Sequence, residues 1–366
     1  MSKKVVGIFT TGEGHQSIAE AAKNALQKDY KIKIFYEDFP FLNIYVALYQ
    51  FFPSLSQIPF KAISKNKNID SSVHKITFLK YRKGIDDFFT KHHPDLLINT
   101  YGLFTSSLEK IQDITQVPFI NIISDPKTFL SLTISPNAKI NLTFNKEADR
   151  FCKQYYPKAN YQSVGWFVGN RFEEKYDQKQ VRKELGLDLN KLTFLIASGS
   201  EGTNLIMKIL PALVLSPKSV QIIVACGNNK SLFNNIETLN SFLDKSKKHN
   251  KLIPLEFTPK MHLYMQAADM VIGKAGPNTL FETVATKTPF FAITHIAGQE
   301  DGNLDIIREY NLGYVEENPL KAQKNLKKII EHPEKLKSFE NDISKMKNYN
   351  QQAKEKLRKI VANLIQ

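Results

Sequence analysis

Residues 270–282, MVIGKAGPNTLFE, run from an apolar stretch through two glycines and a proline into a segment of helical pattern. The apolar residues before the first glycine indicate a buried strand, and proline is favoured in the first turn of a helix. The stretch therefore predicts a strand, a tight turn and a helix that begins near Asn278, with Glu282 one turn inside it. Such junctions are the units from which parallel α/β sheets are built.

The same alternation of strand and helix patterns occurs in two groups along the chain, separated near Val164 to Arg171. Apolar strands that alternate with helices form parallel sheets. We therefore predict an α/β protein of two Rossmann-like doubly wound domains facing a central cleft, residues 1–165 and 166–366, with surface helices from about Lys321. The expected strands are 5–10, 31–38, 95–100, 119–124, 141–145, then 193–198, 219–226, 252–257, 269–273, 289–294 and 312–317.

Composition places the chain among globular proteins. Its 366 residues are 42% hydrophobic, enough for two domains with cores of their own. The two cysteines, Cys152 and Cys226, form no CxxC or Cys/His cluster, so we expect a reducing compartment. No apolar run reaches the ~18–20 residues needed to cross a bilayer, and the start has no signal-peptide pattern. The protein is expected to be cytoplasmic or peripheral.

The formal net charge of +14 is compatible with nucleic acid, an anionic membrane surface or acidic small molecules as partners. No nucleic-acid-binding module is recognisable, so nucleic acid is not expected. Aromatic residues and prolines crowd residues 39–60, and basic residues dominate from there to Lys83. This order predicts contact with an anionic membrane through Tyr45, Tyr49, Phe51, Phe52, Lys61 and Lys65. A helical hairpin packed on its own domain would have the same composition.

Loops rich in glycine or small polar residues follow several predicted strands. They are TGEGH at 11–15, SDP at 124–126, SGSEGTN at 198–204, CGNN at 226–229 and the glycine turn at 273–278. Ligands bind doubly wound folds at the carboxyl ends of the strands, and free N–H groups at a helix start favour a phosphate. Glycine also serves ordinary turns, but the recurrence of these loops at strand ends predicts a ligand site.

These motifs resemble a known family. TGEGHQSIAEAAKNAL, SGSEG, VACGNN, DMVIGKAGPNTLFETVATKTPF and ITHIAGQEDGN are similar to the lipid glycosyltransferases of the monogalactosyldiacylglycerol synthase and processive diacylglycerol glucosyltransferase family, glycosyltransferase family 28. The peptidoglycan UDP-N-acetylglucosamine transferase is a more distant relative. The resemblance extends to about Tyr314. It implies a GT-B fold, a UDP-sugar donor, inverting transfer of a hexose to a lipid such as diacylglycerol, and peripheral attachment to the inner face of the cell membrane.

The resemblance also implies a donor site. The N-terminus of the helix after Gly276 would hold the diphosphate, Glu282 the ribose hydroxyls, Gln299 and Glu300 the sugar hydroxyls, and Phe257 the uracil ring. A helix-capping carboxylate, a polar loop and a core phenylalanine are the alternative interpretations of these positions. The remaining expected donor contacts are Gly14, Ser198, Gly199, Ser200, Gly227, Asn228, Thr258, Met261, Pro277, Asn278, Thr279 and Asn303.

Inverting transfer needs a base that removes the proton of the acceptor hydroxyl. His15, after the glycine turn that follows the first strand, is our candidate. In the alternative, His15 only orients the acceptor or contacts the diphosphate, and Asp125 in SDP is the base. His262 and His295 are expected to have structural roles, and His92 and His93 to end a solvated helix. No Asp-x-Asp pair occurs, so no cofactor or essential metal is expected.

The acceptor side departs from the family pattern. Relatives commonly have a histidine and a tryptophan downstream of the aspartate, where this chain has Phe129, Leu130 and Leu132. Pro277 also replaces a small residue of the glycine turn, at little cost in the first turn of a helix. Two other functions stay open: a nucleotide-sugar epimerase or hydrolase, which would need no lipid, and a non-catalytic basic protein that binds membranes or nucleic acid.

Overall fold

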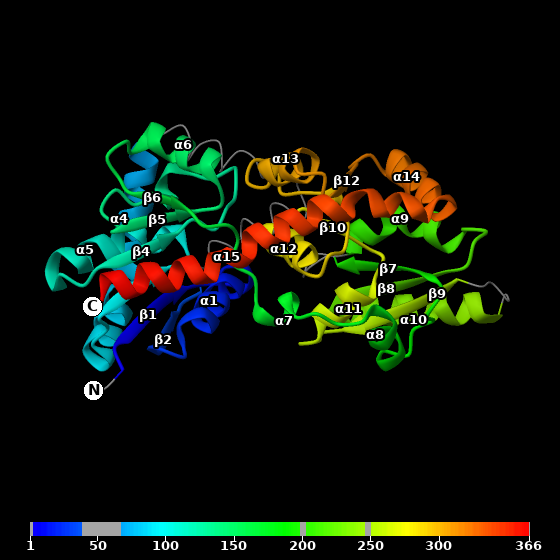
Figure 1. Cartoon of the computed structure of the whole chain (residues 1–366), viewed down its shortest axis with the longest axis horizontal. Helices are drawn as coiled ribbons and strands as arrows, with labels where there is room; N and C mark the ends of the chain where they lie inside the picture. Colours follow the sequence, from blue (N-terminus) through cyan, green and yellow to red (C-terminus); the bar gives the residue numbers. More distant parts are fainter. Residues whose placement is uncertain (1–2, 39–66, 198–202, 246–249, 366) are drawn as a thin grey trace. The chain divides into compact units, whose positions relative to one another are not determined.

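The computed structural model describes residues 3–38, 67–197, 203–245 and 250–365. Two compact units divide the chain, each with its own parallel sheet (Figure 1). Unit 1 comprises Met1–Asn170, Ala297–Gly302 and Asn348–Gln366, and unit 2 comprises Arg171–Ile296 and Asn303–Lys347. The predicted α/β class, with two parallel sheets, is confirmed.

The sheet of unit 1 has the strand order β2-β1-β3-β4-β5-β6 within the described residues. Its inner strands β3 and β4 are buried on both faces, as their leucine, isoleucine and phenylalanine residues predict. The strands are β1 Val5–Thr10, β2 Lys31–Tyr36, β3 Leu96–Asn99, β4 Phe119–Ile122, β5 Ile140–Thr143 and β6 Tyr161–Ser163. The helices are α1 Glu13–Leu26, α4 Lys67–His92, α5 Thr105–Thr115 and α6 Lys146–Tyr155, with short 3₁₀ helices at Gly102–Phe104 and Ser131–Thr133.

An aromatic core holds α4 and α5 on the sheet of unit 1. Phe9 of β1, Phe104 and Phe119 of β4 are fully buried. The Phe9 ring lies 4.9 Å from that of Phe35 and 5.2 Å from that of Phe88 on α4, measured between centroids. Full burial of one such side chain contributes roughly 1.5–3 kcal/mol.

The sheet of unit 2 has the strand order β12-β11-β10-β7-β8-β9. Its strands are β7 Leu192–Ala197, β8 Val220–Gly227, β9 Lys251–Glu256, β10 Met270–Lys274, β11 Phe290–Thr294 and β12 Gly313–Val315. The helices are α7 Asn170–Glu173, α8 Gln178–Glu184, α9 Thr203–Val214, α10 Lys230–Lys245, α11 Met261–Ala267, α12 Pro277–Ala285, α13 Asp301–Glu309 and α14 Pro319–Glu331, followed by a 3₁₀ helix at Pro333–Phe339 and by α15 Glu340–Leu364. α7, α13 and α15 have residues in both units.

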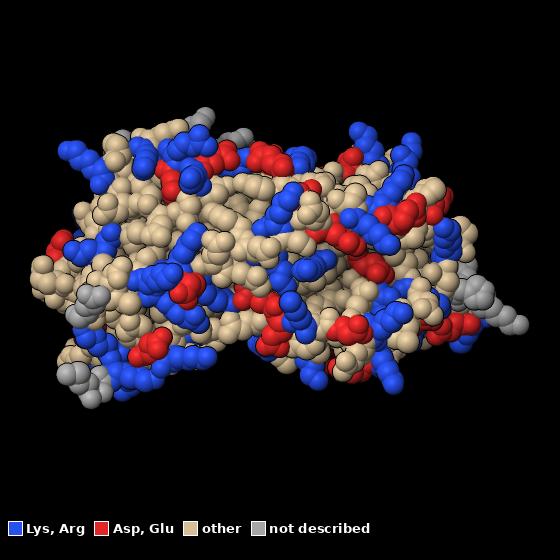
Figure 2. All heavy atoms as spheres, in the orientation of Figure 1, with Lys and Arg blue, Asp and Glu red and all other residues tan. Residues whose placement is uncertain are grey.

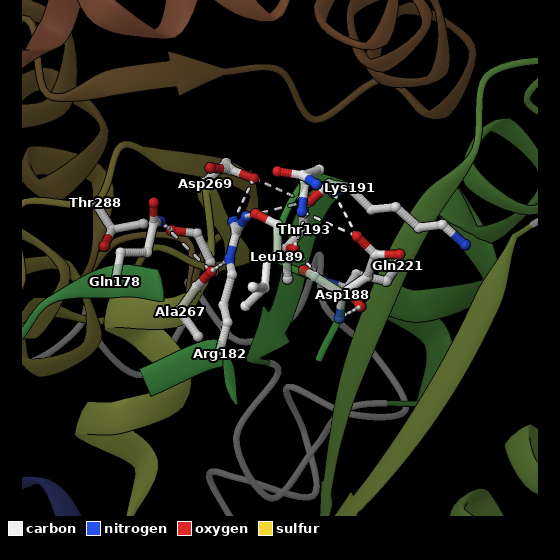
Figure 3. Close-up of polar contacts among 12 residues, drawn as sticks. Gln178, Arg182, Asp188, Leu189, Lys191, Thr193, Gln221, Ala267, Asp269 and Thr288 are labelled. Atoms are coloured by element: carbon white, nitrogen blue, oxygen red, sulfur yellow. Dashed lines mark hydrogen bonds and ion pairs between the residues drawn. The ribbon is translucent and has the colours of Figure 1, made fainter. Parts of the chain in front are cut away.

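A network of polar contacts lies at the amino end of the unit 2 sheet (Figure 3). The Arg182 guanidinium pairs with the carboxylate of Asp269 at 2.8 Å and donates to the carbonyl of Ala267 at 2.8 Å. Gln221 donates to the carbonyl of Asp188 at 2.9 Å and to the hydroxyl of Thr193 at 2.7 Å. These contacts satisfy buried polar groups, which would otherwise cost free energy.

The structure differs from the expected organisation in two places. β6 is an edge strand that the sequence pattern did not predict, because its three residues, YQS, lack an apolar run. Residues 166–366 were all expected in the second domain, yet Ala297–Gly302, with Gln299 and Glu300, and the C-terminal Asn348–Gln366 belong to unit 1. Only tertiary contacts, not the chain order, assign these segments. In unit 1, Arg358 donates to the carbonyl of Ala25 at 2.7 Å, and Lys4 to that of Ile365 at 2.7 Å.

Candidate functional site

Each sheet reverses its strand order at one point, and the predicted loops follow the strands there. In unit 1 the reversal lies between β1 and β3, and in unit 2 between β7 and β10. The loop with His15 follows β1, and the glycine turn at 273–278 follows β10. Ligands of doubly wound folds bind outside the carboxyl ends of the strands at such points.

The glycine turn after β10 serves two structural purposes. A Cβ atom on Gly273 would lie 2.4 Å from the carbonyl oxygen of Ala197 in β7, so only glycine allows the two strands to approach. Gly276 is the N-cap residue of α12, and Pro277 occupies the first turn. The amide of Asn303 donates to the carbonyl of Ala275 at 2.7 Å and fixes the turn. Asn303, an expected donor contact, is buried and has this structural contact.

In unit 2, the carboxyl group of Glu282 has unusual surroundings. The residue lies in α12 with part of its surface exposed, and its carboxyl group has no hydrogen-bond or ion-pair partner among the described residues. Burial raises the pKa of its carboxyl group to about 8. A carboxyl group kept without a partner beside a helix N-terminus is a typical feature of a ligand site, because the ligand can supply the missing donors.

Phe257 lies at the end of β9 with 73% of its surface exposed. Its backbone N–H donates to the carbonyl of Gly227 at 3.0 Å, and Gly227 has a positive φ of 55° at the end of β8. Core burial, the alternative interpretation of Phe257, does not apply. Thr258 accepts from the amide of Lys260 at 3.1 Å, just before Met261 begins α11. An exposed aromatic ring at a strand end is available to stack on a planar ligand.

His15 lies in the first turn of α1, partly buried. Its Nδ1 is 2.8 Å from the carbonyl oxygen of Thr100, which can only accept, so Nδ1 carries the proton and Nε2 remains an acceptor. The ring packs edge-on against Tyr101 with 4.7 Å between centroids. Burial lowers the pKa of His15 to about 4, which the bond to Thr100 partly offsets, so the imidazole is neutral at pH 7.

Asp125 lies in the connection between β4 and β5. Burial raises the pKa of its carboxyl group to about 7, with an opposing hydrogen bond from Gln299 and a smaller rise caused by Glu300. The Gln299 amide nitrogen is 3.5 Å from Oδ1 of Asp125. The backbone N–H of Gly302 also donates to the hydroxyl of Thr128 at 2.7 Å. Unit 1 thus brings together Asp125 and the pair Gln299 and Glu300.

Other predicted residues have local roles or lie beyond the described ranges. Gly14, Pro277, Asn278, Thr279 and Asn228 lie at or beside the first turns of helices. His295 pairs with Glu317 at 2.7 Å, and His262 is buried beside Phe172, in agreement with structural roles. Residues outside the described ranges are Ser198, Gly199, Ser200, Tyr45, Tyr49, Phe51, Phe52, Lys61 and Lys65.

Sequence patterns missed the contacts that hold these loops. The bond between Thr128 and Gly302 joins residues far apart in the chain, and no local pattern reveals it. Asn99, Asn121 and Asn141 are also buried in neighbouring strands. Asparagine is depleted in strands, so one such residue in each of three consecutive apolar runs was the available signal.

Comparison with known proteins supports the resemblance. Residues 193–364 match the glycosyltransferase family 28 C-terminal domain. A processive diacylglycerol beta-glucosyltransferase of Bacillus licheniformis is 22% identical over 271 residues, covering 74% of this chain and 70% of the relative. Monogalactosyldiacylglycerol synthase 3 of Arabidopsis thaliana is 27% identical over 342 residues, covering 86% of this chain and 71% of the relative.

Solved structures show the same architecture. Acinetobacter baumannii MurG superimposes with a TM-score of 0.60 at 15% identity, covering 98% of this chain and 100% of that one. Arabidopsis thaliana UGT89C1, solved with UDP-L-rhamnose, gives a TM-score of 0.66 at 11% identity, with both chains fully covered. These likenesses confirm the predicted GT-B fold.

Proposed function

We propose that this chain transfers a hexose, with inversion, from a UDP-sugar to a hydroxyl group of a membrane lipid such as diacylglycerol, because residues 193–364 match the glycosyltransferase family 28 C-terminal domain and the chain is similar to lipid glycosyltransferases. The observation that carries the donor half of this proposal is Glu282. Its carboxyl group has no partner among the described residues, and it lies one turn inside a helix whose N-terminus suits a diphosphate.

The donor would bind along the carboxyl end of the unit 2 sheet. The uracil ring stacks on Phe257, the diphosphate meets the first turn of α12, and the ribose hydroxyls donate to Glu282. Those bonds require the ionised carboxylate. Ribose binding therefore lowers the pKa of Glu282 from about 8, because hydrogen bonds to the charged form favour it.

We assign Asp125 as the base and His15 as a residue that orients the acceptor. A general base works best when its pKa lies near the working pH, and the pKa of Asp125 is about 7 whereas that of His15 is about 4. Asp125 takes the proton of the lipid hydroxyl, the hydroxyl oxygen attacks the anomeric carbon, and the bond between that carbon and the diphosphate oxygen breaks. UDP then leaves with the electron pair of the broken bond.

A surface of α4 supports the membrane half of the proposal. Lys75, Ile76, Leu79, Lys80 and Lys83 recur at helical spacing and are exposed, with exposed fractions of 59% for Ile76 and 69% for Leu79. Apolar side chains bordered by lysines suit shallow insertion beneath anionic headgroups. No helix of the described ranges is long and apolar enough to cross a membrane. On the strength of the exposed apolar and basic side chains of α4, we propose peripheral attachment to the inner face of the cell membrane.

The positive net charge of the chain does not by itself identify α4 as the membrane contact. Figure 2 shows lysine and arginine side chains over both units with acidic side chains between them. Replacing Ile76 and Leu79 by serine should weaken sedimentation with anionic vesicles even at low salt, because apolar burial is lost. Leu320→Ser, at an equally exposed leucine of α14, is the matched control and should sediment as the wild type. Equal loss in both variants would remove α4 from the membrane contact.

The proposed function is tested with a panel of UDP-glucose, UDP-galactose and UDP-N-acetylglucosamine against vesicles that contain diacylglycerol and anionic lipid. Mass spectrometry should find a glycosylated lipid, with UDP released only when lipid is present, and EDTA should not stop the transfer. Release of UDP and free sugar without lipid would overturn the transferase proposal in favour of a hydrolase, and interconversion of the UDP-sugars would favour an epimerase.

A further inference from the structure

Three buried asparagines form a continuous row across the sheet of unit 1. Asn99 of β3, Asn121 of β4 and Asn141 of β5 are partners in the strand register, and all three are fully buried. The Asn99 amide donates to Oδ1 of Asn121 at 3.0 Å, and the Asn121 amide donates to Oδ1 of Asn141 at 2.8 Å. We call this row the asparagine ladder.

Each asparagine also donates a hydrogen bond to a group outside the ladder, and Asn141, the last of the three, donates only to such groups. Asn99 donates to the hydroxyl of Thr105 at 3.2 Å, and Asn121 to the carbonyl of Thr133 at 2.8 Å. Asn141 donates to the carbonyl of Ser135 at 2.7 Å and accepts from its N–H at 3.0 Å. Networks in which every buried group is satisfied are rigid and specify one arrangement.

The loops that the ladder holds carry both catalytic candidates. On one side, Oδ1 of Asn99 accepts from the N–H of Tyr101 at 3.2 Å, and Tyr101 and its neighbour Thr100 contact the His15 ring. On the other side, Thr133 and Ser135 belong to the connection that contains Asp125. That connection has only a short 3₁₀ helix, Ser131–Thr133, in place of a crossover α-helix.

A parallel sheet does not need a row of buried asparagines for its stability. Valine, isoleucine or leucine at these positions would bury apolar surface, whereas a buried carboxamide costs free energy unless every bond is made. We propose that Asn121, the centre of the asparagine ladder, is a positioning residue that sets the loop of Asp125 relative to the loop that supports His15. Through this positioning, Asn121 determines how efficiently the enzyme uses the lipid acceptor. The inference rests on the proposed function.

The test compares Asn121→Leu with Gln221→Leu. Gln221 is an equally buried carboxamide with two donated bonds, but it lies at the amino end of the unit 2 sheet (Figure 3). Both variants are expected to lower Tm. Below both transitions, Asn121→Leu should reduce kcat/KM for the lipid acceptor at least tenfold with unchanged affinity for UDP, whereas Gln221→Leu should keep kcat/KM within twofold of the wild type. Asn121→Ser replaces Asn121→Leu if the latter does not fold.

A second measurement separates this inference from the proposed function. Hydrogen exchange should become faster in residues 123–135 of the Asn121 variant and stay unchanged in residues 220–227, whatever the acceptor is. Faster exchange in an enzyme whose wild type transfers no sugar to lipid would contradict the proposed function alone. An active Asn121 variant with wild-type acceptor kcat/KM and wild-type exchange in residues 123–135 would overturn the positioning role.

Discussion

Each sheet has a carboxylate at its amino end and another at its carboxyl end, and the surroundings of the two differ. At the amino ends, Asp95 accepts from the N–H of Val5 at 2.7 Å in unit 1, and Asp269 accepts from that of Thr193 at 2.8 Å in unit 2. Asp269 also pairs with Arg182. At the carboxyl ends, burial raises the pKa of Asp125 to about 7 and that of Glu282 to about 8.

The difference separates carboxylates that have close partners within the protein from carboxylates that have few or none among the described residues. A carboxylate bonded to backbone N–H groups or to a guanidinium recovers its desolvation cost within the protein. Glu282 recovers none from the described residues, and Asp125 has one amide donor at the long distance of 3.5 Å. Both carboxyl groups lie at the sheet ends where such folds bind ligands, and in the function that we propose the substrates offset this desolvation cost.

Asp125→Asn should have the largest effect. The variant removes the proposed base without changing its size, so turnover should fall by about two to four orders of magnitude while UDP affinity stays constant. In the wild type, the rate should rise with pH through about 7, because the base must lose its proton. A rise centred near pH 4, together with an active Asn variant, would move the role to His15.

Asp269→Ala tests the amino end and should reduce stability rather than binding. The change leaves Arg182, whose side chain is only 5% exposed, with an unpaired charge, so the free energy of unfolding should fall by about 2–3 kcal/mol. Urea unfolding measures this loss of free energy. Asp305→Ala, which breaks the exposed pair with Arg308, is the matched control and should cost less than about 1 kcal/mol. Equal losses in the two variants would contradict a structural role specific to the amino end.

The sequence predicted most of the fold and the place of Glu282 within it. Runs such as LLIN and FINI are apolar except for one asparagine each and are buried at every position, as expected for strands covered on both faces of a parallel sheet. Glu282 was recognisable because strand, glycine turn and helix follow one another within a few residues, so local spacing fixes its place one turn into α12.

Residues that act through distant partners could not be predicted in the same way. Arg182 and Asp269 are 87 positions apart, and only the pairing of β10 with β7 brings Asp269 to the start of β7. Each asparagine of the ladder is by itself a polar residue in a strand, and it acquires a role only through the register of three strands. The assignment of Asn348–Gln366 to unit 1 likewise depends on tertiary contacts.

Glu282→Ala should weaken UDP binding by about 1–3 kcal/mol, the usual scale for hydrogen bonds to a charged group. Isothermal titration calorimetry at pH 8 gives the affinity directly. Asp269→Ala is the counterpart at the other end of β10 and should bind UDP as the wild type does at a temperature where both variants are folded. If Glu282→Ala binds UDP normally, Glu282 does not contact the ribose.

Glu282→Gln should give the smallest effect, a rise in Tm that depends on pH. The carboxyl pKa is about 8 in the folded protein against a reference of 4.5, so between these values the folded state retains a proton that the unfolded state has released. Wild-type stability therefore falls as pH increases through this window and levels off above it. Glutamine has no such proton, so the variant should melt several degrees higher than the wild type at pH 8, at about 2–4 °C for each kcal/mol, and at nearly the same temperature at pH 4.5. Scanning calorimetry without ligand tests this, and an equal difference at both pH values would show that packing, rather than an unpartnered carboxylate, distinguishes the two proteins.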